Sequence, residues 1–75
     1  MFEITFHLLG LEEEERIEEM FLDGLPRVGD RVGFEDIEKG CFGKVIKVDW
    51  NILRKEDGGG YQNETWNDVY VSFEE

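Results

Sequence analysis

Reactive side chains are few in this sequence, and the two that stand out are a lone histidine, His7, and a lone cysteine, Cys41. A cysteine acts as a nucleophile only as its thiolate, so it needs a nearby base and a third group that orients the base. His7 falls on the polar face of a separate predicted strand, and no third group is evident. We therefore expect no catalytic residues and a protein that is not an enzyme, with Cys41 buried or half-buried and His7 exposed.

A glycine-rich stretch at residues 40–45, GCFGKV, superficially resembles the end of the nucleotide-binding loop of protein kinases. Glu38 occupies the place of that motif's upstream glycine, and a chain of 75 residues has no room for a catalytic lobe. The glycines are better explained by turn and bulge geometry, with Gly43 as the position where a strand bends. We expect no cofactor.

The strongest local charge run consists of four consecutive acidic residues, Glu12, Glu13, Glu14 and Glu15. They lack the alternating Asp and Asn ligands and the mid-loop glycine of a calcium-binding loop. One His and one Cys cannot make a zinc cluster either, so we predict no metal site. The run is then either a solvated tip or an acidic surface that docks a basic protein partner.

Acidic residues also dominate the whole chain, whose formal net charge is −11 at pH 7. Twelve of the nineteen acidic residues lie within residues 1–38, alongside three arginines. The resulting negative potential repels phosphate groups, so we expect no direct binding of nucleic acid. No apolar run approaches the roughly 20 residues that a membrane-spanning helix needs. With a single unpaired cysteine and no secretion signal, the sequence predicts a soluble protein of the cytoplasm that does not bind membranes.

Aromatic residues of the second half make the most promising binding constellation, which comprises Trp50, Tyr61, Trp66 and Tyr70. If residues 50–66 close a hairpin, the two tryptophans should lie near each other across the strand pair. They would then either pack as a lid over the end of a barrel or form an exposed patch that anchors a protein partner. An outward-facing Tyr70 on a final strand would also allow edge pairing with a second copy or with a peptide.

Strands are the elements that must position these residues. Residues 1–9 alternate between polar and apolar side chains, as a half-buried strand does, and the apolar face carries Phe2, Ile4, Phe6 and Leu8. Residues 11–22 fit either a short helix, since glutamate and leucine favour helix, or a second hairpin strand over about 15–22. We favour the strand, because the apolar stripe is thin and the first strand needs a partner for its backbone. A bulge is expected there, because Ile17 and Phe21 share a face with Glu19.

Two further strands are predicted in the second half. Residues 41–53 read as a long bent strand with Ile46, Val48 and Trp50 on one face and Val45 on the other. Val69, Val71 and Phe73 define the last strand. Between them, residues 54–65 read as a flexible polar connection around three glycines.

Residues 28–48 contain the pattern Val-Gly-Asp-Arg-Val, a short loop, and then Gly-Lys-Val. This pattern resembles the SH3-like barrels of KOW and Tudor-like domains, in which a Gly-Asp-x-Val strand entry is followed about ten residues later by a Gly-x-Val strand start. The resemblance implies a fold, and through the acidic departure from the basic members it implies a protein partner in place of RNA. We therefore predict one all-β domain over residues 1–75, or β with one short helix at 11–22, folded as a small five-stranded SH3-like barrel.

The expected function is that of a protein-interaction module or small accessory protein. Its acidic first half would orient a basic partner, and its aromatic patch would supply the anchor. The alternative is an inhibitor that mimics nucleic acid, of the size and charge typical of phage anti-defence proteins. Homodimers through an edge strand are compatible with either function.

Overall fold

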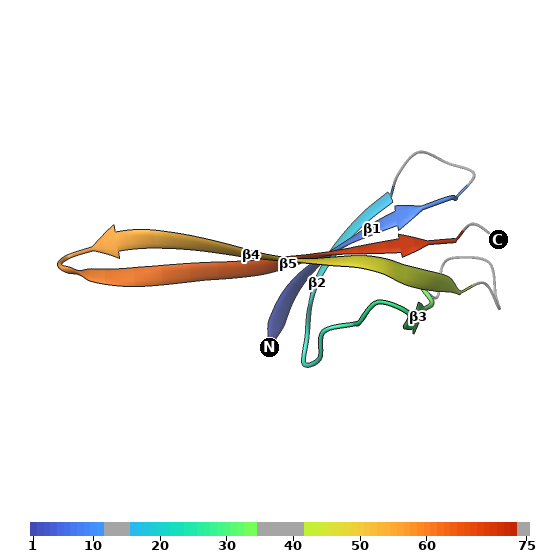
Figure 1. Ribbon diagram of the computed structural model, residues 1–75, viewed down its shortest axis with the longest axis horizontal. Helices are drawn as coiled ribbons and strands as arrows, with labels where there is room; N and C mark the ends of the chain where they lie inside the picture. Colours follow the sequence, from blue (N-terminus) through green and yellow to red (C-terminus); the bar gives the residue numbers. More distant parts are fainter. Residues whose placement is uncertain (12–15, 35–41, 74–75) are drawn as a thin grey trace.

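The computed structural model describes residues 1–11, 16–34 and 42–73, without the side chains of Asp57 and Tyr61. These residues form one five-stranded sheet and no helix, which confirms the predicted all-β class. The strands are β1 (Phe2–Leu9), β2 (Arg16–Leu22), β3 (Arg31–Val32), β4 (Gly43–Asp57) and β5 (Gly60–Ser72). Their order is β2-β1-β5-β4-β3, with β1 and β5 parallel and all other neighbours antiparallel. The sheet curls into a half-barrel (Figure 1). No helix long and apolar enough to cross a bilayer occurs in this described part of the chain.

The concave face of the sheet carries the hydrophobic core. Its six buried members come from three neighbouring strands and are Ile4, Phe6, Leu8, Val45, Val69 and Val71. The alternation predicted for residues 1–9 is confirmed, because β1 buries every second side chain on this face. Phe34 packs on the core with its ring edge-on to that of Phe6, and the two ring centroids lie 5.6 Å apart.

Residues 16–22 settle the choice between helix and strand. β2 pairs with β1 residue for residue, from Phe2 opposite Leu22 to Leu8 opposite Arg16. This pairing satisfies the outer backbone groups of β1, a requirement that outweighed the helix propensity of the glutamates. The register is continuous, so the bulge predicted in this strand is wrong. Ile17 and Phe21 stay on the convex face and are exposed to solvent.

The bulge lies instead in β4, where the register with β5 shifts between Val45 and Lys47. The shift inserts Ile46 as an extra residue, so Val45 faces Val71 and Val48 faces Val69 on the same concave side. The sequence prediction placed Val45 and Val48 on opposite faces and is wrong here, because a bulge changes the parity of every later residue. Val45 belongs to the core, whereas Ile46 is exposed.

Residues 54–65 are not the flexible connection that their composition predicts. β4 runs on to Asp57 and β5 starts at Gly60, so the two strands form one long hairpin (Figure 1). Gly58 and Gly59 make its two-residue turn with φ values of 56° and 92°. Two successive positive φ values are those of a type I′ turn, whose twist matches that of the flanking strands. The glycines therefore specify a tight turn at the end of a hairpin.

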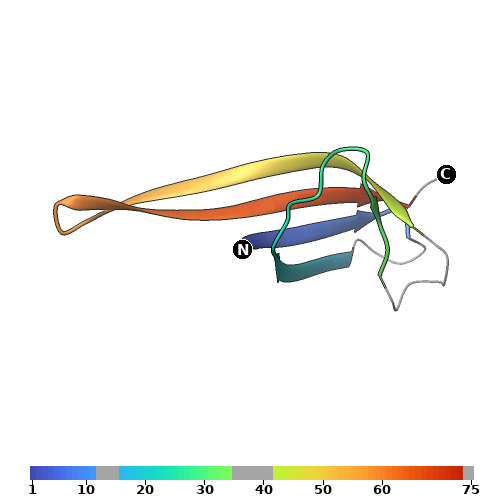
Figure 2. The ribbon, with the colours of Figure 1, turned by 90° about the horizontal axis from the view of Figure 1, so that it is seen from below.

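Residues 23–30, termed the strap, connect β2 at one edge of the sheet to β3 at the other. The strap consequently has to cross the sheet, and it does so over the concave face (Figure 2). Leu25 packs against the core from this position. At the far end the backbone of Gly29 donates to the carbonyl oxygen of Val45 at 2.8 Å, and the Val45 N–H donates to Asp30 at 2.9 Å. The strap is thus fastened to β4 at the start of the bulge.

Candidate functional site

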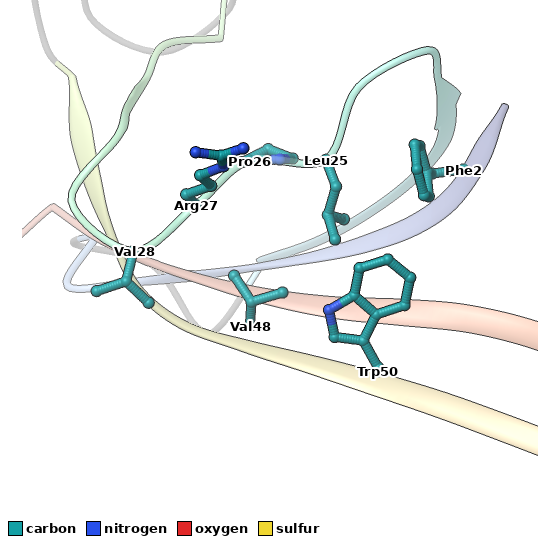
Figure 3. A pocket seen from close by; sticks show the side chains of 7 residues that line it. All are labelled: Phe2, Leu25, Pro26, Arg27, Val28, Val48 and Trp50. Carbon is teal, nitrogen blue, oxygen red and sulfur yellow. The ribbon is translucent and has the colours of Figure 1, made fainter.

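A groove opens between the strap and the concave face of the sheet. Its volume is about 480 Å³, and its lining consists of Phe2, Leu25, Pro26, Arg27, Val28, Val48 and Trp50. Figure 3 shows Leu25 pointing from the strap toward Val48 and Trp50, whereas Val28 lies at the other end of the groove beside β4. Apolar side chains therefore face each other from two elements without closing the space between them.

The floor of the groove is formed by Val48 and Trp50 of β4, and the same apolar row continues past the groove to Ile52. Val48, Trp50 and Ile52 follow one another at the two-residue spacing that keeps side chains on one face of a strand. Trp50 contacts Phe2 edge-on, with ring centroids 5.8 Å apart, yet 59% of its surface remains exposed. Val28 is 64% exposed and Ile52 69% exposed. Trp50 and Ile52 therefore leave apolar surface exposed on the concave face, next to half-buried Val48.

The strap that forms the other wall has a fixed local shape. The Asp30 carboxylate accepts a hydrogen bond from the Arg27 N–H at 2.8 Å, and the Asp30 N–H donates to the Arg27 carbonyl at 3.0 Å. Between them Gly29 adopts a φ of 98°, which side chains with a Cβ rarely adopt. These contacts close a tight turn, so Val28 is presented to the groove by a constrained backbone.

Charge is sparse in the groove. Arg27 is the single charged residue among the seven that line it, although the chain as a whole carries an excess of acid. The Arg27 guanidinium makes no ion pair with any described residue. The groove is therefore an apolar site with a basic group on its wall, set in an acidic molecule.

The two predicted tryptophans are separated by the hairpin register. Trp50 is opposite Asn67, and Trp66 is opposite Asn51. Neighbouring residues of a strand point to opposite faces, so Trp50 lies on the concave face and Trp66 on the convex face. The expected contact between them is wrong, because sequence spacing alone does not give the pairing register. Trp50 lines the groove, and Trp66 does not.

Tyr70 lies on the convex face, as predicted, but within a polar cluster of side chains from three strands. His7 of β1 stacks on its ring with centroids 4.5 Å apart and planes 11° from parallel, and the Lys47 ammonium lies 5.3 Å from the ring centroid. His7 Nε2 is 2.9 Å from Asp68 Oδ1, and Asn51 Nδ2 donates to Asp68 Oδ2 at 2.8 Å. His7 is accordingly half-buried, in contrast to the exposed position predicted for it.

This convex cluster links β1, β5 and β4 side by side, and the Asp68 carboxylate is shared between His7 and Asn51. Its His–Asp pair is an arrangement that sequence reasoning missed, because the two residues are 61 positions apart. Tyr70 also sits on a strand that is central over residues 67–72, with β1 on one side and β4 on the other. Edge pairing through this part of the final strand is therefore ruled out.

Several predicted residues lie outside the described part of the chain. These are the acidic run Glu12, Glu13, Glu14 and Glu15, the thiol Cys41, and the side chain of Tyr61. Within the described part, no group of three or more His, Cys, Asp or Glu residues is placed to hold a metal ion. Sequence reasoning also missed Phe2, Leu25 and Val28 as groove residues. The proline before Arg27, which imposes extended geometry on Leu25, was the available signal for the strap.

Comparisons with known proteins give no relative for this chain. No protein-family model matches it, and no curated protein or solved structure is significantly similar to it. The function must therefore be inferred from the groove and from the charge of the molecule.

Proposed function

We propose that the protein is a non-enzymatic protein-interaction module in which the groove receives an apolar side chain of a partner protein. The observation that carries this proposal is the apolar floor of the groove, made by half-buried Val48 and exposed Trp50, with exposed Ile52 next in the same row. Interface energy concentrates on aromatic anchors that become fully desolvated on binding. Trp50 is suited to that role, because Phe2 holds its ring on one side and the groove leaves the rest free.

The scaffold is proposed to be SH3-like. Two observations support this assignment: the curled sheet of five strands, and the position of residues 28–48, whose pattern resembles KOW and Tudor-like barrels. These residues include the end of the strap, β3 and the first part of β4, and they contribute Val28 and Val48 to the lining of the groove.

The partner is proposed to be a basic protein of the cytoplasm. This part of the proposal depends on the net charge of −11, which attracts and orients basic surfaces over distances longer than a contact. Arg27 on the groove wall does not serve that attraction. The acidic residues would therefore steer the partner from outside the groove, and apolar contact with Trp50 would hold it.

The test compares partner capture by the immobilised protein and by three variants. Trp50→Ala and Val28→Glu remove the groove's apolar contacts, whereas Trp66→Ala removes a tryptophan from the other face. We expect the first two variants to capture at least tenfold less of the partner, since truncating an anchor costs about 2 kcal/mol or more of binding free energy. The matched Trp66→Ala control should retain it. Circular dichroism confirms that each variant is folded, and equal capture by all three variants would refute the groove as the binding site.

A second candidate is favoured by the charge alone, namely an inhibitor that mimics nucleic acid. Such a protein would compete with duplex DNA or RNA for its partner, and its binding would fall steeply with salt. Replacing Glu12, Glu13, Glu14 and Glu15 together by glutamine would weaken it, whereas Trp50→Ala would have little effect. The two candidates therefore predict opposite sensitivities for the same captured partner.

A further inference from the structure

The distal half of the long hairpin is termed the arm and comprises residues 51–66. β1 pairs with β5 from Asn67 onward, and β3 pairs with β4 at Gly43 and Lys44. Within the described residues, the arm therefore has no strand on either outer edge. It extends well beyond the rest of the sheet (Figure 1), and the molecule measures 51 × 23 × 19 Å.

An arm of this kind has little stability on its own. Two-stranded ribbons are at best marginally stable in water, because neither face is covered. Here Ile52 is 69% exposed on the concave face and Leu53 is 42% exposed on the convex face. No strand of the described residues pairs with the outer edges of the arm, and an open strand edge is a template for another strand. A strand from another chain that paired with the arm would satisfy the backbone groups of that edge.

The charge of the arm indicates which chain this is. Residues 51–66 contain two basic and three acidic residues, a net charge of −1, which leaves −10 on the rest of the molecule. The arm is thus where two acidic molecules can approach each other with the least repulsion. Its β4 strand reads Arg54-Lys55-Glu56-Asp57, two basic residues followed by two acidic ones. In an antiparallel pair of two such segments, Arg54 of each copy can lie opposite Glu56 of the other.

We propose that two copies of this chain associate through their arms, with the free edges of the two β4 strands paired antiparallel about a two-fold axis at Lys55. In this register Arg54 of each copy is opposite Glu56 of the other, and the symmetry makes two such pairs. Backbone groups fit the same register. Asp57 and Gly60 close the hairpin turn, and the alternation of antiparallel hydrogen bonds then turns the N–H groups of Arg54 and Glu56 toward the free edge.

Two potential sources of repulsion are small in this arrangement. The two Lys55 residues meet at the axis, but each ammonium already lies 3.3 Å from the Glu64 carboxylate of its own hairpin. The acidic bodies lie at opposite ends of the shared ribbon. At about 3.3 Å per residue, Trp50 at the near end of the body is about 17 Å from Lys55, so the near ends of the two bodies are about 33 Å apart. That distance is several times the screening length of about 8 Å at physiological salt.

The experiment is sedimentation equilibrium of the whole chain over a concentration series from micromolar to millimolar. We expect a reversible monomer–dimer equilibrium. Arg54→Glu or Glu56→Arg alone places like charges in both cross-strand pairs and should weaken the dimer about tenfold or more. The double variant Arg54→Glu with Glu56→Arg restores opposite charges and should return the association to near its original strength. Lys44→Glu is the matched control, because it makes the same change in net charge as Arg54→Glu outside the arm.

The outcomes decide the proposal. A chain that stays monomeric throughout the series refutes it. So does a dimer that both single variants leave unchanged, or one that the double variant fails to restore. Circular dichroism of each variant checks that the hairpin is retained. The result is independent of partner capture by the groove, since Trp50→Ala leaves the paired edge intact.

Discussion

Single residues decide how closely the curled sheet can pack, and Gly43 is the clearest case. A Cβ at this buried position would lie within about 3 Å of Val71 and of the Phe73 ring, closer than side chains approach. The glycine therefore permits the start of β4 to press against the end of β5. Its sequence-based interpretation as a bend was only partly useful, because the nearest irregularity is the bulge after Val45.

We predict that Gly43→Ala lowers the free energy of unfolding by about 1–3 kcal/mol, because the added methyl group overpacks the core. Urea unfolding followed by circular dichroism measures the change. Gly24→Ala is the control, since a Cβ there meets nothing within 4 Å. Equal stability of the two variants would mean that Val71 and Phe73 can move aside freely.

Asn67 marks the point where the core ends and the arm begins. It is buried on the concave face opposite Trp50, and its Nδ2 donates to the Glu3 carbonyl at 3.2 Å. The same alternation that buries Val69 and Val71 therefore brings a polar residue inward. The change from valine to asparagine along β5 is a signal in the sequence that apolar burial stops there.

At the level of elements, local alternation predicted the strands whose two faces differ, such as Phe2–Leu9 and the end of β5. It could not predict the inner face of β4, because one bulge reverses the parity of all residues beyond it. The sequence also predicted a flexible connection where the outer part of the hairpin lies, since three glycines and several polar residues are typical of loops as well as of a type I′ turn. The backbone geometry of the turn, and not its composition, distinguishes a tight hairpin from a flexible loop.

The two glycines of the hairpin turn should differ in how well they tolerate substitution. Gly59→Ala places a Cβ at a φ of 92°, whereas Gly58→Asn places an asparagine at a φ of 56°, which this residue tolerates. We expect Gly59→Ala to cost about 1–2 kcal/mol of local stability, as a left-handed conformation does for residues other than glycine. Gly58→Asn should cost much less. Amide hydrogen exchange of residues 53–57 measures this directly, and equally fast exchange in the two variants would argue against a type I′ turn.

The whole molecule is more extended than its length requires. Its radius of gyration is 14.8 Å, whereas a compact domain of 75 residues has about 11 Å. The arm accounts for the larger radius of gyration, and its apolar residues do not pack against the core. The groove was foreseeable only in part: Trp50 was predicted as a binding residue, but its partners come from the strap and from β1, which no local pattern connects to it.

A small core and a large charge together set how this protein should respond to salt. In the described part of the chain, six buried apolar residues oppose the mutual repulsion of a net charge of −11, which the folded chain concentrates and the unfolded chain disperses. Raising sodium chloride to several hundred millimolar shortens the screening length and should therefore raise the urea midpoint of unfolding. Ion pairs such as Lys55–Glu64 would be weakened by the same screening, but they are exposed and contribute little. Substitution of two exposed acids, Glu19→Gln and Asp23→Asn, should raise the midpoint in low salt and reduce the gain from salt. A midpoint that falls with salt would show that attractive pairs, and not net repulsion, dominate the electrostatics of the fold.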